Sequence, residues 1–323
     1  NKQEAYLELS KRADLPQRVR VSLLAADEMV TSIVTAENAK TTVNTLEERR
    51  ARFRAASKGR LDAEAVKIFV DGVLENYTGS LLEPYVNVPL GPDHAGETNM
   101  SEQALNSYVE ALDKADFQVH MHAIGDRAVR VGLNAVEGAI NANGRSDHRH
   151  HISHLELVQP EDIKRFKPLG VTANMQTLWH YNDAYISDLT EPFLDEKLHR
   201  WLYPAKSFVE AGTNIVWGSD WPVSSSNPFQ SIEVAVLRKD PDNADDKPWN
   251  AVEAITVDDM IHALTINGAY LMGQEDIRGS LEAGKEADFI ILDADPYKVT
   301  PEDISEIKVQ QTFVGGACVH GCK

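Results

Sequence analysis

Regular alternation of strand-like and helix-like segments is the feature that most limits the fold of this chain. Short apolar runs rich in β-branched residues recur between amphipathic stretches, and six of them fall between Arg18 and Gly218. Neighbouring parallel strands need a long connection, usually a helix, whereas antiparallel strands can be joined by a short turn. The pattern therefore predicts an α/β fold in which parallel strands are joined by crossover helices.

The expected elements can be placed along the printed sequence. Strands are predicted at residues 18–24, 64–70, 117–122, 150–158, 170–176 and 214–218. Helices are predicted at 27–56 with an interruption near Lys40, after Ser101, at 129–143, from Pro160, at 196–211 and from Thr256 to Asn267-Gly268. The proline-containing stretch 73–98 is predicted to be a lid or binding loop. Residues 279–293 and 309–319 are predicted to be short strands of a small β appendage.

Charge and composition argue against two classes of partner. The 323 residues carry a formal net charge of −18, which repels nucleic acid and anionic lipid, so we expect neither a nucleic-acid nor a membrane partner. No apolar run approaches the roughly 18 residues of a membrane span. The two cysteines, Cys318 and Cys322, do not form a disulfide framework and fit a reducing compartment. We therefore expect a cytoplasmic protein.

Four predicted strand ends carry side chains that can bind a metal ion: Lys67, His122, His154 and Asp220. Two imidazoles and a carboxylate are a normal ligand set for zinc or a similar divalent ion. The carboxyl ends of the strands build the active site of a parallel α/β barrel, so these side chains can converge if the strands close into one. The sequence thus predicts a metal site at that end of the strands.

Each of these residues also has a simpler interpretation. A lone strand histidine is usually a core or surface group, and His120, two residues before His122, is assigned to the core or to support behind the ligands. Lys67 could pair with a carboxylate such as Asp71. Asp220 could cap the turn that follows it. Two histidines and an aspartate at three strand ends favour the metal site.

Residues that follow the strand ends are candidates for contact with a substrate. A substrate with an apolar or aromatic part would suit these polar and aromatic side chains, although they could equally pack the loops. They are Tyr77, Thr78, Gln176, Trp179, His180 and Trp221. Arg200 and Arg238 could bind a carboxylate, but arginines on helix surfaces usually do not. The substrate is therefore predicted only as a small molecule.

Several motifs together resemble the amidohydrolase superfamily, in the branch that includes the N-substituted formamide deformylases. They recur in the family's order and span about residues 15 to 320. The motifs are Val66-Lys-Ile-Phe-Val-Asp71-Gly72, His122-Ala-Ile-Gly-Asp126-Arg127-Ala128, His154-Leu-Glu-Leu-Val158, Gly218-Ser-Asp220-Trp221-Pro222-Val223 and Gly279-Ser-Leu-Glu-Ala-Gly-Lys285-Glu-Ala-Asp288.

The resemblance implies a role for each candidate ligand. Lys67 would end barrel strand 4, where such enzymes often carry a carboxylated lysine that bridges two metal ions. His122 and His154 would be the ligands from strands 5 and 6. Asp220, at strand 8, would bind metal and accept the proton of the attacking water. The implied cofactor is one or two divalent ions, with zinc expected.

The resemblance also implies a (β/α)8 TIM-type barrel with a small β-sandwich built from both chain ends. In this family a His-x-His pair lies on barrel strand 1, but no histidine precedes Lys67 in this chain. Strands 1 and 2 are therefore expected to be missing, and the start, Asn1 to Leu7, reads as the middle of a helix. The expected domains are a partial barrel at 1–272 and part of the sandwich at 273–323.

The predicted function is that of a metal-dependent hydrolase of amide or other C–N bonds in small molecules, truncated at its N-terminus. An ester or cyclic-amide hydrolase is the alternative with the same chemistry. A non-catalytic or inactive protein that keeps the fold is the alternative from another class. An incomplete barrel exposes unpaired strand edges, so we also expect a homo-oligomer.

Overall fold

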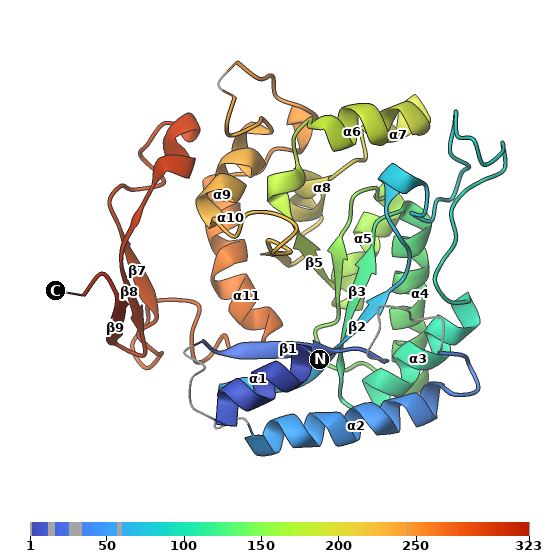
Figure 1. The fold of residues 1–323 in the computed structure, drawn as a ribbon, viewed down its shortest axis with the longest axis horizontal. Coiled ribbons are helices and arrows are strands. Elements are labelled where there is room, and N and C mark those ends of the chain that lie inside the picture. The colour runs from blue at the N-terminus through green and yellow to red at the C-terminus, as the bar shows by residue number, and fades with distance from the viewer. Residues whose placement is uncertain (1, 12–16, 26–33, 57–59, 244, 323) are drawn as a thin grey trace. The chain divides into compact units, whose positions relative to one another are not determined.

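The structure is a computed structural model that describes residues 2–11, 17–25, 34–56, 60–243 and 245–322 (Figure 1). The chain separates into two compact units, Asn1–Val171 and Thr172–Lys323. Both units contain parallel strands connected through helices, and the second also contains a small antiparallel sheet. The predicted division at residue 272 stays a prediction.

Four parallel strands form the sheet of the first unit. They follow one another in chain order: β1 (Val19–Leu23), β2 (Leu61–Phe69), β3 (Gln118–Ala123) and β4 (His151–His154). Lys67 pairs with His120 across β2 and β3, and His120 pairs with His151 across β3 and β4. Phe69 and His122 pair two residues further towards the carboxyl ends, on the same face of the sheet. The register therefore places a lysine and several histidines on neighbouring strands at nearly the same level.

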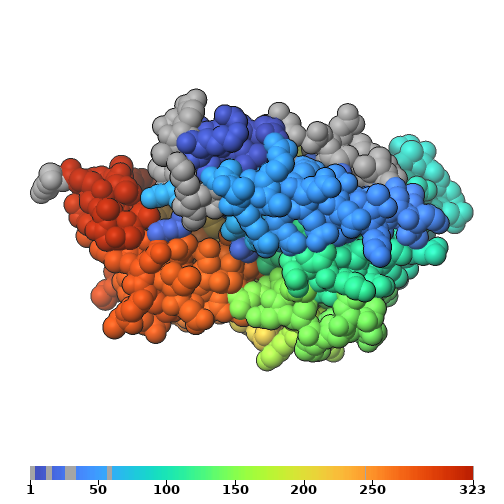
Figure 2. Space-filling model, turned by 90° about the horizontal axis from the view of Figure 1, so that it is seen from below, coloured from blue at the N-terminus to red at the C-terminus, as the bar shows by residue number. Residues whose placement is uncertain are grey.

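Helices connect and flank these strands. They are α1 (Lys2–Lys11), α2 (Ala39–Ala56), α3 (Glu102–Lys114), α4 (Asp126–Asn143) and α5 (Pro160–Leu169), with a short 3-10 turn, η2 (Leu74–Asn76), in the loop after β2. The Ser101 side chain accepts a hydrogen bond from the Ala104 amide and caps α3, as its residue type predicts. In Figure 2, α1 and α2 lie side by side, joined by an Arg52–Glu4 ion pair of 3.0 Å.

The predicted interruption of the second helix near Lys40 is wrong. α2 runs without a break from Ala39 to Ala56, because Val43, Leu46 and Phe53 recur at helical spacing and are all buried. The beginning of the predicted helix falls within residues 26–33, which lie outside the described residues. Burial of one face stabilises this helix by more than the polar residues of its first turn destabilise it.

Two parallel strands, β5 (Thr172–Met175) and β6 (Ile215–Trp217), pair in the second unit. The α-helices around them are α6 (Ala184–Leu189), α7 (Glu196–His199), α8 (Ala205–Glu210), α9 (Pro228–Leu237), α10 (Val257–Leu264) and α11 (Ile266–Leu271). Four 3-10 turns complete the unit: η3 (Thr177–Trp179), η4 (Glu191–Phe193), η5 (Ala251–Glu253) and η6 (Pro301–Glu306). Helix α9 has no counterpart among the predicted elements.

Two predicted helices of this unit are divided in the structure. The helix expected at 196–211 is broken into α7 and α8, because Pro204 has no amide to donate and Tyr203 takes the left-handed conformation with φ 48°. The helix that begins at Thr256 does have the predicted cap, a reciprocal capping box with Asp259. It ends at Leu264, and α11 then runs through the Asn267-Gly268 pair that was expected to stop it.

The appendage is a three-stranded antiparallel sheet of β7 (Phe289–Leu292), β8 (Val309–Val314) and β9 (Ala317–His320). Residues 279–288 form turns and irregular structure, so the predicted strand is shorter than expected. Cys318 and Cys322 form a disulfide, which was not predicted from the sequence. Disulfides persist mainly in oxidising compartments, and the cytoplasmic location therefore stays a prediction.

The parallel strands, four in the first unit and two in the second, establish the predicted α/β class and are consistent with part of a TIM-type barrel. None of the described helices combines the length and the apolar character needed to cross a membrane.

Candidate metal centre

The carboxyl ends of β2, β3 and β4 bring three of the four predicted ligands to one part of the first unit. The rings of His122 and His154 are in edge-to-face contact, with centroids 4.6 Å apart, and both residues are buried. The Lys67 amine lies 3.2 Å from Nε2 of His120 and 5.1 Å from the centre of the Phe69 ring. Phe69 also contacts His122, with ring centroids 5.4 Å apart, so this one ring lies beside both the lysine amine and a histidine.

His122 is held in the protonation state and tautomer that a metal ligand needs. Its Nε2 lies 2.8 Å from the Gly72 carbonyl oxygen, which can only accept, so the ring proton must be on Nε2. Burial lowers the pKa of His122 to about 4, which keeps the ring neutral. The lone pair is therefore on Nδ1. In metal sites a histidine ligand is oriented in the same way: one ring nitrogen binds the metal, and the other donates its proton to a carboxylate or a carbonyl oxygen.

Asp71 lies beside the Nε2 atom of His122, and its carboxylate links the loop after β2 to the turn after β3. Its carboxylate accepts hydrogen bonds from the backbone amides of Ser80, Ile124 and Gly125 at 2.9–3.0 Å, and Oδ1 lies 3.5 Å from Nε2 of His122. Burial raises the pKa of Asp71 to about 7, against the opposing effect of these three amides. The sequence indicated Asp71 as part of an Asp-Gly turn and as a possible partner of Lys67, but it did not indicate these hydrogen bonds to distant backbone amides.

Gly125 allows the loop after β2 to approach the loop after β3. A Cβ at this position would lie 2.1 Å from the Ser80 carbonyl oxygen, a contact that no side chain could make. The loop that contains Ser80 therefore packs directly on the turn that follows His122. The lid or binding loop predicted at 73–98 is accordingly tied to the candidate centre by backbone contacts.

His154 and Asp220 both have left-handed backbone conformations, with φ 82° and 55°. Such conformations cost about 1–3 kcal/mol for residues other than glycine and are concentrated at functional sites. Asp220 follows β6 in the second unit, where it is exposed and its carbonyl oxygen accepts a hydrogen bond from the Val223 amide. The convergence of Asp220 with the two histidines stays a prediction.

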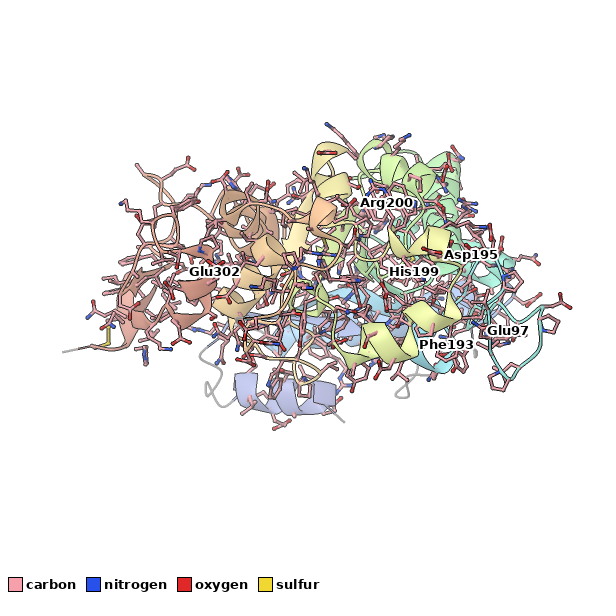
Figure 3. The ribbon with its side chains drawn as sticks, turned by 90° about the horizontal axis from the view of Figure 1, so that it is seen from above. Glu97, Phe193, Asp195, His199, Arg200 and Glu302 are labelled. Atoms are coloured by element: carbon pink, nitrogen blue, oxygen red, sulfur yellow. A yellow bond between two sulfur atoms is a disulfide. The ribbon has the colours of Figure 1, made fainter. Side chains whose placement is uncertain are left out.

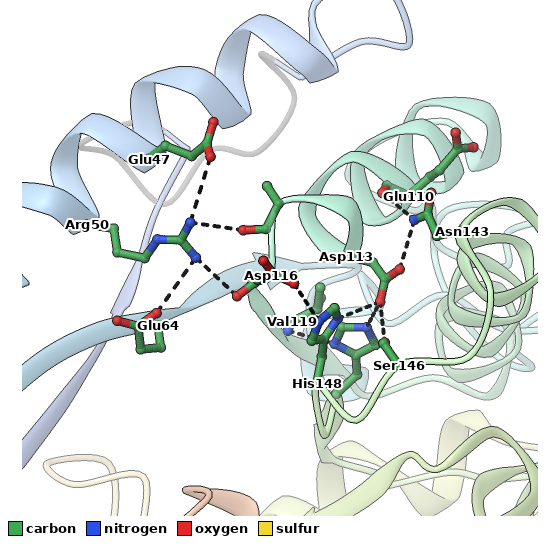
Figure 4. Close-up of polar contacts among 12 residues, drawn as sticks. Glu47, Arg50, Glu64, Glu110, Asp113, Asp116, Val119, Asn143, Ser146 and His148 are labelled. Carbon is green, nitrogen blue, oxygen red and sulfur yellow. Dashed lines mark hydrogen bonds and ion pairs between the residues drawn. The ribbon is translucent and has the colours of Figure 1, made fainter.

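A second group of metal-ligand side chains, Asp113, His148 and His150, lies at the amino ends of β3 and β4 (Figure 4). Asp113 Oδ1 is 2.7 Å from Nδ1 of His148 and 3.1 Å from Nε2 of His150, and it also accepts from the Ser146 hydroxyl at 2.8 Å. The amino ends of barrel strands are typically important for stability, whereas catalysis occurs at the carboxyl ends. This group was not predicted from the sequence.

The hydrogen bonds of His150 oppose metal binding by this group. The Val119 amide donates to Nδ1 of His150 at 3.0 Å, so the proton of the neutral ring must be on Nε2, which faces Asp113. A nitrogen that carries this proton has no lone pair for a metal ion. We therefore interpret the Asp113 group as a hydrogen-bond network that joins α3 to the segment before β4.

His148 is expected to make unfolding pH-dependent. Its two ring nitrogens lie 2.7 Å from Asp113 and 3.2 Å from Asp116, and these carboxylates raise the pKa of His148 above 6.5. A raised pKa in the folded state stabilises the protein fully below about pH 6.5, and this stabilisation is lost as the pH rises through the folded-state value. We expect the free energy of unfolding to fall by about 1 kcal/mol above pH 6.5.

Urea unfolding at several pH values between 6 and 9 measures this dependence. His148→Gln is the matched variant, because it keeps a polar side chain that does not titrate. An equal pH dependence in the variant and the original chain would contradict the assignment.

Other polar candidates from the sequence have mainly structural partners. Arg200, at the end of α7 (Figure 3), lies over the Trp201 ring at 4.7 Å and is more than half exposed, as expected for a surface arginine. Arg238 was predicted to be on the surface but is fully buried, and its guanidinium donates to the carbonyl oxygens of Tyr203 and Trp249. His180 is buried and stacked on Tyr203, with ring centroids 4.6 Å apart.

Comparison with known proteins decides the family. The model of the amidohydrolase family matches residues 1–320. The chain belongs to the amidohydrolase family. Among its relatives is Protein LONG AFTER FAR-RED 3 of Arabidopsis thaliana, 33% identical over 251 residues, with a match that covers 78% of this chain and 42% of that protein. The N-substituted formamide deformylase of Arthrobacter pascens is 26% identical over 225 residues, covering 69% of this chain and 40% of the enzyme.

A solved structure supports the same assignment. An uncharacterised metal-dependent hydrolase from Pyrococcus furiosus superposes with a TM-score of 0.70 at 28% sequence identity, over 91% of this chain and 54% of that protein. The amidohydrolase chain described here thus spans about half the length of the relatives that it matches. The family suggests a divalent metal, and the neutral His122 beside His154 provides suitable donors for it.

Proposed function

We propose that this amidohydrolase chain contributes metal ligands and a general base to a hydrolase that cleaves an amide or another C–N bond of a small molecule. The observation that carries the proposal is the hydrogen bond from Nε2 of His122 to the Gly72 carbonyl, which leaves the Nδ1 lone pair for a metal ion. Family membership supports the reaction class, and the similarity to a formamide deformylase supports a C–N bond as its target.

Four residues have roles in this proposal. Lys67, as an amine or in a carboxylated form, would bind one or two divalent ions together with His122, His154 and Asp220, and zinc suits these donors. A metal ion bound there supplies acidity to a water molecule and polarises the scissile carbonyl. Asp220 accepts the proton of the attacking water and passes it to the leaving nitrogen.

Metal analysis followed by an activity assay tests the proposal. The purified chain is dialysed against zinc, freed of excess metal and analysed for zinc, and hydrolysis of N-substituted formamides is then measured. We expect one or two equivalents of zinc and release of formate. A chain that retains no zinc would contradict the proposal and favour a non-catalytic protein that keeps the fold.

The proposal also covers the partners of the chain and its cellular location. Its net charge of −18 supports a small-molecule substrate rather than a nucleic-acid or membrane partner. Among the described strands, β1 pairs only with β2, and an open sheet edge of this kind supports association with further copies of the chain. A cytoplasmic location is part of the proposal as well.

A further inference from the structure

His120 lies at the centre of a polar group on the sheet of the first unit. Its Nε2 is 3.2 Å from the Lys67 amine and 2.7 Å from the Ser153 hydroxyl, and its Nδ1 is 3.3 Å from the Ser22 hydroxyl. The three partners come from β1, β2 and β4, so one imidazole on β3 connects all four strands. The ring also contacts that of His151, with centroids 4.2 Å apart.

Donor and acceptor chemistry gives each of these contacts a direction. A lysine ammonium group can only donate, so Nε2 of His120 must accept from Lys67, and its lone pair is shared with the Ser153 hydroxyl. The proton of the neutral ring is then on Nδ1, which donates to the Ser22 hydroxyl. The two serines thereby restrict rotation of the imidazole and keep its lone pair facing the lysine.

The position of Lys67 explains why an acceptor is needed there. Lys67 is paired in register with His120, two pairs before Phe69 and His122 and on the same face of the sheet, and its side chain is partly buried. A partly buried ammonium group that loses a hydrogen-bond acceptor either pays a desolvation cost or moves towards water.

We propose that His120 is a positioning residue for Lys67, holding its amine on the sheet below the His122–His154 pair through an acceptor nitrogen oriented by Ser22 and Ser153. The relevance of this contact to metal binding rests on the proposed function, because Lys67 is one of the suggested ligands. The positioning itself is a property of the metal-free chain and can be tested without metal.

Two variants of similar volume separate the acceptor from the space that the ring fills. His120→Gln keeps an oxygen acceptor, whereas His120→Leu removes it. Each metal-free protein is treated briefly with an amine-acetylating reagent, and the rate of modification of Lys67 is measured by peptide mass spectrometry. Lys298, whose side chain is 81% exposed, is the internal reference. Urea unfolding shows whether both variants are folded.

We expect the Lys67 rate relative to Lys298 to rise about ten-fold in His120→Leu, because a hydrogen bond to a charged group is lost, and to stay near the original value in His120→Gln. Equal rates in the original chain and His120→Leu, or equal increases in both variants, would overturn the proposal. Zinc titration of the same three proteins is the second measurement. A chain that binds no zinc contradicts the proposed function, while the labelling rates still decide the role of His120.

Discussion

The His122→Ala variant is expected to retain at least about ten-fold less zinc than the original chain, because even the loss of a residue behind a metal ligand usually costs ten-fold or more in affinity. The hydrogen bond to Gly72 and the low pKa of His122 prepare its Nδ1 for this role. Asp220→Ala is expected to lower zinc content several-fold as well, because Asp220 is the proposed carboxylate ligand. Elemental analysis after dialysis against zinc measures both effects.

His148→Gln is the matched control for this experiment, since it changes a histidine of the Asp113 group at the other ends of the strands. We expect it to keep the zinc content of the original chain. Zinc loss in His148→Gln together with full zinc content in His122→Ala would locate the metal at Asp113 and contradict our assignment.

Asp71→Ala is expected to lower the free energy of unfolding by about 4 kcal/mol, because three buried backbone amides each lose their acceptor at a cost of about 1–3 kcal/mol. These amides belong to the loops after β2 and β3. Removing the carboxylate therefore also removes the group that lies beside Nε2 of His122. Urea unfolding followed by circular dichroism measures the change.

Asp71→Asn is the control, because one side-chain oxygen remains as an acceptor and the volume is unchanged. We expect it to lose about half as much stability, since the new amide group faces backbone amides that also donate. An Asp71→Ala protein as stable as the original chain would show that the two loops do not depend on this carboxylate.

Much of the fold follows from local patterns. The six parallel strands and the caps at Ser101 and Thr256 were predicted because the apolar period and the capping chemistry act over a few residues. Errors occurred where a single residue or distant packing decided the outcome. Pro204 divides α7 from α8, and burial of Val43 and Leu46 carries α2 through a polar turn.

The candidate ligands could be predicted because side chains at the ends of consecutive parallel strands meet at one edge of the sheet. The contacts that prepare them could not be predicted. Asp71, Gly72 and Ser80 are near one another in sequence, but their partners His122, Ile124 and Gly125 are on the next strand and its turn. Nothing in the spacing of these residues specifies which nitrogen of His122 carries the proton.

The sequence by itself determined the α/β class, the order of the strands and the residue types presented at their ends, because these depend on periodicity and on short-range turn chemistry. Only the tertiary structure decided that Asp71 lies beside His122 and that His120 accepts a hydrogen bond from Lys67. It also decided that His150 presents a protonated nitrogen, not a lone pair, to the carboxylate of Asp113. The physical reason is that a hydrogen bond assigns a proton to one atom, and this assignment depends on which groups the fold brings within about 3 Å of it.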